Sequence, residues 1–244
     1  MSLLLGNPIE VTNVGKVYPI KIKDHDRFSR YTWTVEKSKK SINKKDSEEP
    51  LIFLLMEEMQ KSEEDGGMIF IMCLLELIKM VTREEVEFIP ETISFKIGKS
   101  NTETVNGEEI VFESERFLNF SNFEEFREVV CKQNIIHEKR YHSKPFQDEI
   151  DRQLEIERKR NGGTSFDTVF QIISIKMGVT YDVISNMTYM QVLSNFQRIM
   201  LEKSYDTSVS FKVAGAECDI EDFTKDLDIF KHPEDTIIQR KKGK

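Results

Sequence analysis

Two apolar segments separated by a very short break constrain the fold more than any other part of the sequence. The first, 50–61, begins at Pro50, and the second, 68–81, follows an Asp-Gly-Gly sequence at 65–67. Proline is favoured at the first position of a helix, and paired glycines favour a turn. Two apolar helices joined by so short a connection usually pack as an antiparallel pair. We expect this pair to form the core of an N-terminal domain.

The second apolar segment raises the question of a membrane span. It reads MIFIMCLLELIKM over 68–80 and is interrupted by Glu76 and Lys79. A helix needs about 20 apolar residues to cross a bilayer, so a buried helix is the better interpretation. The N-terminal sequence MSLLLGNPIE lacks the basic region of a signal peptide, and we expect a soluble, intracellular protein.

Charge and cysteine content narrow the class of partner. Hydrophobic residues make up 39% and charged residues 32% of the chain, which is typical of a globular protein. The net charge of −8 disfavours nucleic acid as the main partner, because phosphate binding normally needs a basic surface. The cysteines Cys73, Cys131 and Cys218 lack metal-ligand spacing, and we expect them to be apolar fillers in a reducing compartment.

Strand signals occur in two places. Residues 8–23 predict a hairpin or two short strands with Gly15 in the turn, and the alternation at Ile20 and Ile22 suits a half-buried strand. The second place, 86–113, alternates around an Asn-Gly turn at 106–107, with Pro90 placing its first strand at an edge or starting it later. We expect an inserted β-hairpin there, with strands carrying Ile93, Phe95 and Ile97 on one side and Ile110 and Phe112 on the other.

Helices account for most of the remaining chain. One should begin after Asp24 or Asp26, while the polar stretch 37–49 is either a solvated helix end or a mobile loop. A capping box of Ser121 and Glu124 predicts the start of a helix at 121. Four phenylalanines spaced three apart around it are interpreted as a packing stripe: Phe117, Phe120, Phe123 and Phe126. The charged stretch 136–160 predicts an exposed helix after Pro145 that bridges two domains.

The C-terminal third has the most regular pattern. Thr164 or Ser165 caps a helix that Gly178 ends, a short helix follows Thr180, and a longer helix begins at a cap on Thr188 and ends near Gly215. In the tail, apolar residues at 220, 223, 227 and 230 could form a small helix on the body or a helix that docks on a partner.

These segments predict a mainly α fold with a β minority (α+β). We expect an N-terminal α+β domain over 1–135 with the hairpin at 86–113. A charged bridging helix or linker should follow over 136–163, and a C-terminal helical domain with a tail over 164–244.

No motif assembles a catalytic site. His137 and His142 are five apart, which is off the register for two ligands on one helix face, and His25 between two aspartates is a weak signal because adjacent side chains diverge. Gly162 and Gly163 lack the spacing of a phosphate-binding loop. We therefore expect no catalytic residue, no cofactor and no metal, and a role in binding other proteins.

A partner surface could include apolar side chains of the long helix and the tail. The candidates are Phe196, Met200, Phe223, Leu227 and Phe230. The alternative is that they are ordinary core residues.

The C-terminal succession of SFDTVFQIISIKMG, VTYDVISNMT and YMQVLSNFQRIMLEKSYDTSVSFKVAGA resembles tail assembly chaperones of tailed bacteriophages of Gram-positive hosts. The N-terminal sequence VGKVYPIKIKDHDRF is similar to the start of related phage tail proteins. The residues that carry the C-terminal resemblance are Tyr181, Val183, Met187, Thr188, Tyr189, Val192 and Ala214–Ala216.

This resemblance implies a non-enzymatic protein of the host cell cytoplasm. Such chaperones bind the tape measure protein, help to recruit tail tube subunits and are absent from the finished particle; self-association is possible among them. One alternative is a structural component of a phage tail, baseplate or phage-like particle. A second alternative is an enzyme or nucleic-acid-binding protein of unrecognised type.

Overall fold

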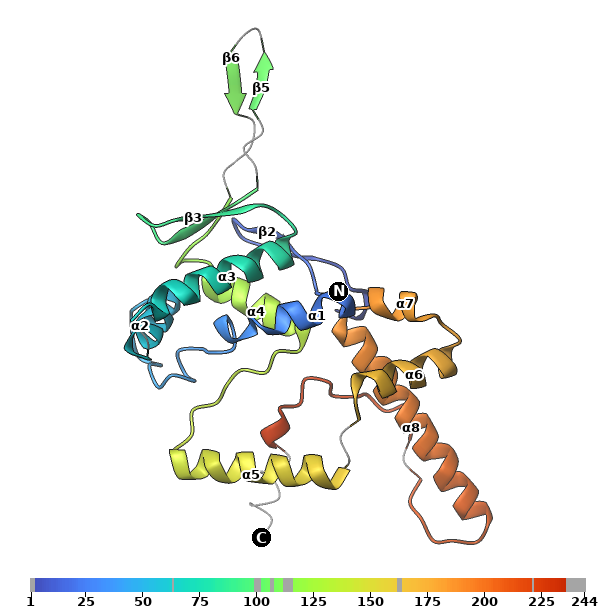
Figure 1. Ribbon diagram of the computed structural model, residues 1–244. Coiled ribbons are helices and arrows are strands. Elements are labelled where there is room, and N and C mark those ends of the chain that lie inside the picture. The colour runs from blue at the N-terminus through green and yellow to red at the C-terminus, as the bar shows by residue number, and fades with distance from the viewer. Residues whose placement is uncertain are drawn as a thin grey trace. The chain divides into compact units, whose positions relative to one another are not determined.

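The computed structural model divides the chain into two compact units (Figure 1). The N-terminal unit comprises Met1–Ile20 and Asp24–Tyr141, and the C-terminal unit comprises Lys21–Lys23 and His142–Lys244. The structure describes residues 3–62, 64–98, 102–105, 108–111, 116–161, 164–220 and 222–235. Helices hold 55% of the residues and strands 9%, which confirms a mainly α fold with a β minority. The three-part division at 135 and 163 stays a prediction.

The N-terminal unit begins with the expected hairpin. Strands β1 (Ile9–Val11) and β2 (Gly15–Val17) pair antiparallel around a turn at residues 12–14. Gly15, expected in the turn, is instead the first residue of β2 and adopts a positive φ of 92°. The strand expected at Ile20 and Ile22 is wrong, because α1 (Ile22–Ser29) already begins at Ile22. This helix therefore starts earlier than the expected caps at Asp24 or Asp26. Asp24 lies inside its first turn, where its negative charge interacts favourably with the positive end of the helix dipole.

The two apolar helices that constrain the fold are both present and pack against each other. Helix α2 (Leu51–Ser62) starts after Pro50, whose carbonyl accepts hydrogen bonds from the backbone N–H groups of Phe53 and Leu54. Helix α3 (Gly66–Thr82) is the most buried element of the unit. Among the described residues, no helix is both long and apolar enough to cross a membrane. The preceding polar stretch 37–49 forms turns instead of a helix end.

The segment 86–113 forms two hairpins where the sequence predicted one. Strands β3 (Val86–Ile89), β4 (Ser94–Ile97) and β7 (Arg116–Leu118) make an antiparallel sheet in the order β3-β4-β7. Strands β5 (Thr102–Val105) and β6 (Glu108–Val111) pair separately. The strand at 94–97 thus pairs with β3 and β7 instead of with 110–112, because the chain already reverses at 90–93, where Pro90 follows the end of β3. The Asn-Gly sequence at 106–107 and Phe112 lie outside the described residues.

Helix α4 (Phe123–Asn134) is present, but the expected capping box is wrong. The N-cap is Asn122, and the Ser121 hydroxyl donates to Asn119 Oδ1 instead of capping the helix. The Asn122 amide donates to the carbonyls of Thr12 and Phe117 at 2.9 and 2.8 Å, which ties the start of α4 to two strand segments. The Asn122 side chain makes no capping hydrogen bond to α4, and its bond to Thr12, 110 positions away, cannot be found from local spacing.

The expected phenylalanine stripe is also divided. Phe123 and Phe126 are buried on α4, whereas Phe117 belongs to β7 and Phe120 is half exposed in the connection. The stripe pattern assumed one continuous helix, and the strand β7 interrupts it.

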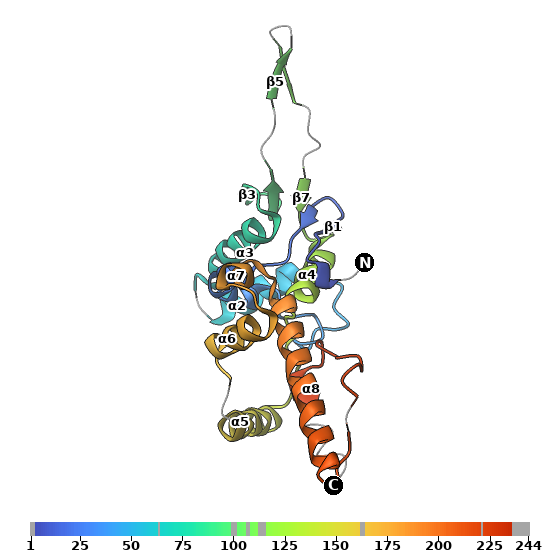
Figure 2. The ribbon, with the colours of Figure 1, turned by 90° about the vertical axis from the view of Figure 1, so that its right-hand side faces the viewer.

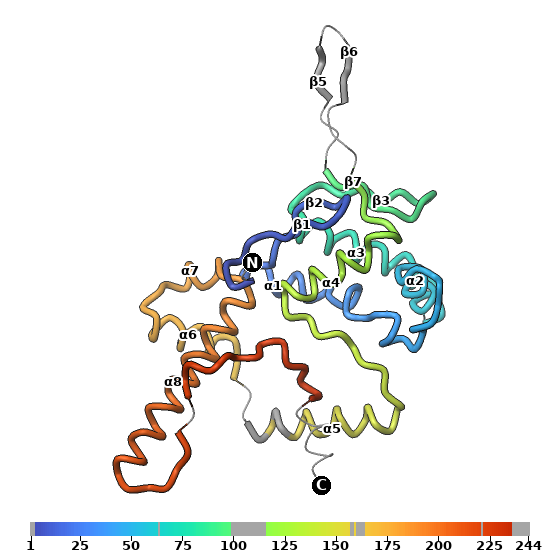
Figure 3. Tube along the Cα trace, turned by 180° about the vertical axis from the view of Figure 1, so that it is seen from behind, coloured from blue at the N-terminus to red at the C-terminus, as the bar shows by residue number. Residues whose placement is uncertain are grey.

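Side-chain amides at the end of α4 fasten the N-terminal hairpin. Asn134 Oδ1 accepts from the backbone N–H of Ile20 at 2.9 Å, and Gln133 Nε2 donates to the carbonyl of Val17 at 3.1 Å. The backbone N–H of Phe117 in β7 donates to the carbonyl of Asn13 at 2.8 Å, so the hairpin lies beside this end of the three-stranded sheet (Figure 3). Hydrogen bonds between segments that are far apart in the sequence therefore help to hold this unit together.

The C-terminal unit is helical, and its long helix extends well beyond the shorter ones (Figures 1 and 2). Its elements are α5 (Lys144–Asn161), α6 (Phe166–Met177), α7 (Tyr181–Asn186) and α8 (Tyr189–Val213). Ser165 caps α6 by accepting from the N–H of Thr168, and Gly178 ends it at φ 66°. Thr188 caps α8 in a capping box with Gln191. The predicted starts and stops of α6, α7 and α8 are confirmed, whereas α5 begins at Lys144, before Pro145.

The small helix expected in the tail is wrong: residues 217–220 and 222–230 form turns or extended chain. The Asp222 carboxylate accepts from both the N–H and the hydroxyl of Thr224 at 2.8 and 2.7 Å, and Asp228 accepts from the N–H of Phe230. Short polar side chains that bond nearby backbone in this way compete with helix formation. The Arg198 guanidinium on α8 donates to the carbonyls of Phe223 and Lys225.

Candidate functional site

Titratable side chains in the described ranges do not gather into a site of three or more groups that could hold a metal ion. Burial lowers the pKa of His25, and the neighbouring Asp26 acts in the opposite direction. Burial raises the pKa of Cys131 to about 12 and also raises that of Cys73. Both thiols are therefore poor nucleophiles near neutral pH, since the thiolate is the reactive form.

Helices α6, α7 and α8 surround a very small core. Its buried members are Ile173, Ile184 and Val192, one from each helix. Partly buried apolar side chains, among them Phe170 and Phe196, pack around these three. The same helices border two pockets, one between α6 and α8 and one between α6 and α7. Pockets with apolar walls are the usual places where a protein receives a ligand or a partner's side chain.

The α6–α8 pocket is narrow and aromatic, with a volume of about 210 Å³. The Phe166 ring lies 6.1 Å from the Tyr189 ring and 5.8 Å from the Phe170 ring. Burial raises the pKa of Tyr189. Polar atoms are scarce among its lining residues, which are Thr164, Phe166, Val169, Tyr189, Val192, Leu193 and Phe196.

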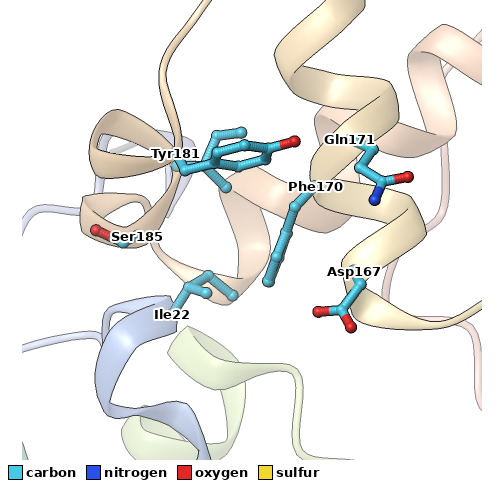
Figure 4. A pocket seen from close by; sticks show the side chains of 7 residues that line it. Ile22, Asp167, Phe170, Gln171, Tyr181 and Ser185 are labelled. Carbon is cyan, nitrogen blue, oxygen red and sulfur yellow. The ribbon is translucent and has the colours of Figure 1, made fainter.

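The α6–α7 pocket is larger, about 510 Å³, and mixes apolar and polar groups (Figure 4). Phe170 reaches from α6 toward Ile22, and Tyr181 reaches from α7 toward α6 (Figure 4). Ile22 is present because residues 21–23 belong to this unit: Lys21 makes a bridge with Thr188, and the N–H of Ile22 donates to the carbonyl of Met187 at 2.9 Å. The other lining residues are Asp167, Gln171, Ile184 and Ser185.

The structure brings one of the predicted partner-binding residues into a pocket. Phe196 lines the α6–α8 pocket, and Met200, one turn later on α8, is 47% exposed. Phe223 packs instead against Tyr205, with ring centroids 5.0 Å apart, and is 38% exposed. Leu227 is half-buried and Phe230 is 43% exposed. The role of the five residues as a partner surface stays a prediction.

Sequence reasoning missed most of the pocket residues. Phe166, Val169 and Phe170 belong to a helix that was predicted correctly, but their spacing of three and four is the pattern of ordinary core. The signal that could have singled them out is the lack of enough apolar partners in α7, the short helix that follows. A pocket exists where several helices meet, so no single helix pattern reports it.

A comparison with protein families gives one match. Residues 157–228 match the family model described as YomV second domain, a phage-associated family. The match covers less than a third of the chain and extends from the end of α5 to the tail, including α6, α7 and α8. No curated protein and no solved structure matches the chain. The residues that match, which border both pockets, give weak support for a phage-related protein.

Proposed function

We propose that this chain is a non-enzymatic phage tail morphogenesis factor, a chaperone that binds the tape measure protein in the host cytoplasm and helps to recruit tail tube subunits. The observation that carries the proposal is the aromatic α6–α8 pocket, which lies inside the phage-associated match. The resemblance of residues 164–216 to tail assembly chaperones supplies the identity of the partner.

The size and lining of the α6–α8 pocket favour a protein partner over a metabolite. Its volume of about 210 Å³ lies below the roughly 300–1,000 Å³ of typical small-molecule sites. An apolar anchor of a helix needs only a hole for one side chain, with further anchors at spacings of three and four. Phe196 and Met200 lie one turn apart on α8 and would present such a path to a partner helix.

The proposal of a non-enzymatic role rests on the kinds of groups near the pockets. The α6–α8 pocket offers a threonine hydroxyl and a phenol as its polar side chains, and the phenol of Tyr189 has its pKa raised by burial. The residues that line this pocket include no histidine and no carboxylate that could act as a base. Such a lining can bind apolar groups but does not supply acid–base or nucleophilic chemistry.

Avidity would make weak individual contacts sufficient. A tape measure protein is long, so several copies of a chaperone could bind along one molecule, and linked binding events reinforce one another. A pocket of about 210 Å³ that takes one side chain at a time suits this arrangement.

Co-expression of the full chain with the tape measure protein from the same phage genome tests the proposal. We expect the tape measure protein to remain in the soluble fraction and to elute together with the chain. Phe196→Ala should weaken co-elution by about tenfold or more, the effect typical of a buried aromatic anchor. Phe211→Ala is the matched control, because this residue also lies on α8 but is 58% exposed and outside the pocket.

Two results would contradict the chaperone. A tape measure protein that stays insoluble and yields no complex would exclude the proposed partner. Recovery of the chain in purified particles by mass spectrometry would favour the alternative, a structural component of the tail or baseplate.

A further inference from the structure

The α6–α7 pocket has a chemical character that the α6–α8 pocket lacks. Its volume of about 510 Å³ falls within the range of ligand-binding pockets. Ile22, Phe170 and Ile184 provide apolar walls, and Tyr181 adds a second aromatic ring. One ionisable carboxylate, that of Asp167, is part of the lining.

The polar groups of α6 are available to a ligand. Asp167 and Gln171 are four residues apart and therefore lie on one face of the helix, on the same side of the pocket (Figure 4). Within the described ranges, no hydrogen bond or ion pair engages the side chain of either residue. The hydroxyl of Ser185, in contrast, already donates to the carbonyl of Asp182 at 2.8 Å.

The nearby positive charges are held elsewhere. Lys21 and Lys23 flank Ile22 in the sequence, but both ammonium groups donate to Asn186 Oδ1, at 3.2 and 3.1 Å. Neither lysine is part of the pocket lining. The one charged side chain among the lining residues is therefore that of Asp167.

We infer that the α6–α7 pocket binds the guanidinium group of an arginine side chain presented by the partner protein. A guanidinium donates two parallel hydrogen bonds to a carboxylate, here Asp167, and the Gln171 amide oxygen can accept a further one. Its flat face stacks on an aromatic ring, which Phe170 and Tyr181 offer, and its methylene stem suits Ile22 and Ile184. A carboxylate or phosphate ligand would instead be repelled by Asp167.

Arginine is preferred over lysine for a geometric reason. The lysine ammonium is compact and strongly hydrated and cannot stack flat on a ring, whereas the guanidinium is planar and more weakly hydrated. The identification of a protein as the source of the arginine rests on the proposed function. The chemistry of the pocket does not depend on it.

Titration of the isotope-labelled full chain with N-acetyl-arginine amide, followed by NMR, tests the pocket directly. We expect saturable shifts of the Gln171 and Tyr181 signals. N-acetyl-citrulline amide, which has nearly the same shape without the charge, should bind about tenfold more weakly, because hydrogen bonds to charged groups are the stronger ones. N-acetyl-lysine amide should lie between the two.

Asp167→Asn should reduce arginine binding to the level of citrulline. Asp182→Asn is the matched control: each aspartate is the second residue of its helix, so both changes remove a favourable charge at a helix N-terminus, but Asp182 does not line the pocket. Tyr181→Ala, at a side chain that is 58% exposed, should weaken binding severalfold without unfolding the helix.

Four results would each contradict an arginine site in this pocket. They are equal binding of arginine and citrulline, unchanged binding in Asp167→Asn, equal weakening in Asp182→Asn, and titration shifts that do not saturate. These results separate the inference from the proposed function. A tape measure complex without arginine binding would contradict the arginine site but leave the proposed chaperone function intact. Arginine binding without a tape measure complex would support the arginine site but exclude the tape measure protein as the source of the arginine.

Discussion

The two units use their apolar residues in different ways. In the N-terminal unit, α3 buries Leu74, Leu77 and Ile78 completely, within a core that continues into α2, α4 and the sheet. In the C-terminal unit, α6 buries Ile173 but leaves Ile175 80% exposed. Both units also expose apolar side chains, since α3 leaves Met68 58% and Met72 55% exposed, but the buried core of the N-terminal unit is much the larger. An exposed apolar surface of this kind is typical of proteins that bind partners.

The two units also differ in whether their polar side chains are paired within the protein. Asn122, Gln133 and Asn134 in the N-terminal unit are buried and bonded to backbone groups of distant segments. Asp167 and Gln171 in the C-terminal unit are exposed at the rim of a pocket. Buried polar groups must be paired within the protein because an unpaired group costs free energy, while polar groups at a pocket can be paired by a ligand.

Core truncations should give the largest effects and test the difference between the units. Phe126→Ala should reduce the free energy of unfolding by about 3–5 kcal/mol, and Ile173→Ala by about 2–3 kcal/mol, since a small core bordered by pockets adjusts more easily around a lost side chain. Urea denaturation gives the magnitudes, and hydrogen exchange should show each loss within its own unit. Ile175→Ala, on the same helix as Ile173, should change stability by less than about 0.5 kcal/mol. An Ile175→Ala variant that lowers the free energy of unfolding as much as Ile173→Ala would contradict the described difference between the units.

The contact between α2 and α3 gives a prediction of intermediate size. A Cβ atom at Gly66 would lie 2.1 Å from the carbonyl oxygen of Met59, so Gly66→Ala should force the helices apart and cost about 1–3 kcal/mol. At Gly67 the nearest atom would be the carbonyl oxygen of Met56 at 3.7 Å. Gly67→Ala should therefore stabilise the chain by up to about 1 kcal/mol. Thermal unfolding of the two variants should shift in opposite directions, and a stable Gly66→Ala would show that the N-terminal unit is less tightly packed than described.

The helix caps give the smallest effects. In the C-terminal unit, the N–H of Gln191 donates to the Thr188 hydroxyl at 3.2 Å, and the N–H of Thr188 donates to the Gln191 side chain at 2.8 Å. Thr188→Ala should cost about 1 kcal/mol in urea denaturation. Ser121→Ala in the N-terminal unit should be close to neutral, because its hydroxyl bonds only Asn119 and caps no helix. A loss at Ser121 as large as that at Thr188 would restore the capping box that the sequence suggested.

Local sequence signals succeeded where the structure uses local contacts. The caps at Ser165 and Thr188 and the stop at Gly178 are made by atoms within five residues of one another. The start of α2 after Pro50 is of the same kind. Such interactions are encoded in a short window, so their positions can be derived from spacing alone.

The failures have long-range causes. Ile22 begins a helix where alternation predicted a strand, and its N–H bonds the carbonyl of Met187, far along the chain. Asn122 takes the N-cap position of α4 in place of Ser121, and its amide donates to the carbonyl of Thr12, 110 positions earlier. β4 finds β7 as a partner across the β5–β6 hairpin. A sequence window does not contain these partners.

The pockets of the C-terminal unit contain both residues that the sequence could identify and residues that it could not. Phe196 could be selected from the helix pattern, and it does line a pocket. The residues opposite it, Phe166 and Val169, come from another helix and were not selected. Ile22 could not be assigned to the other pocket from the sequence, because it is separated from the remaining lining residues by more than a hundred positions.

The sequence by itself determined the mainly α fold class, the apolar helix pair and the capped helices of the C-terminal unit. These features follow from hydrophobic periodicity and from hydrogen bonds between near neighbours. Only the tertiary structure decided that residues 21–23 join the C-terminal unit, which strands pair, and that α6, α7 and α8 border pockets beside their core. The physical reason is that a pocket reflects the volume left between helices, and that volume depends on how side chains from distant segments fill the same space.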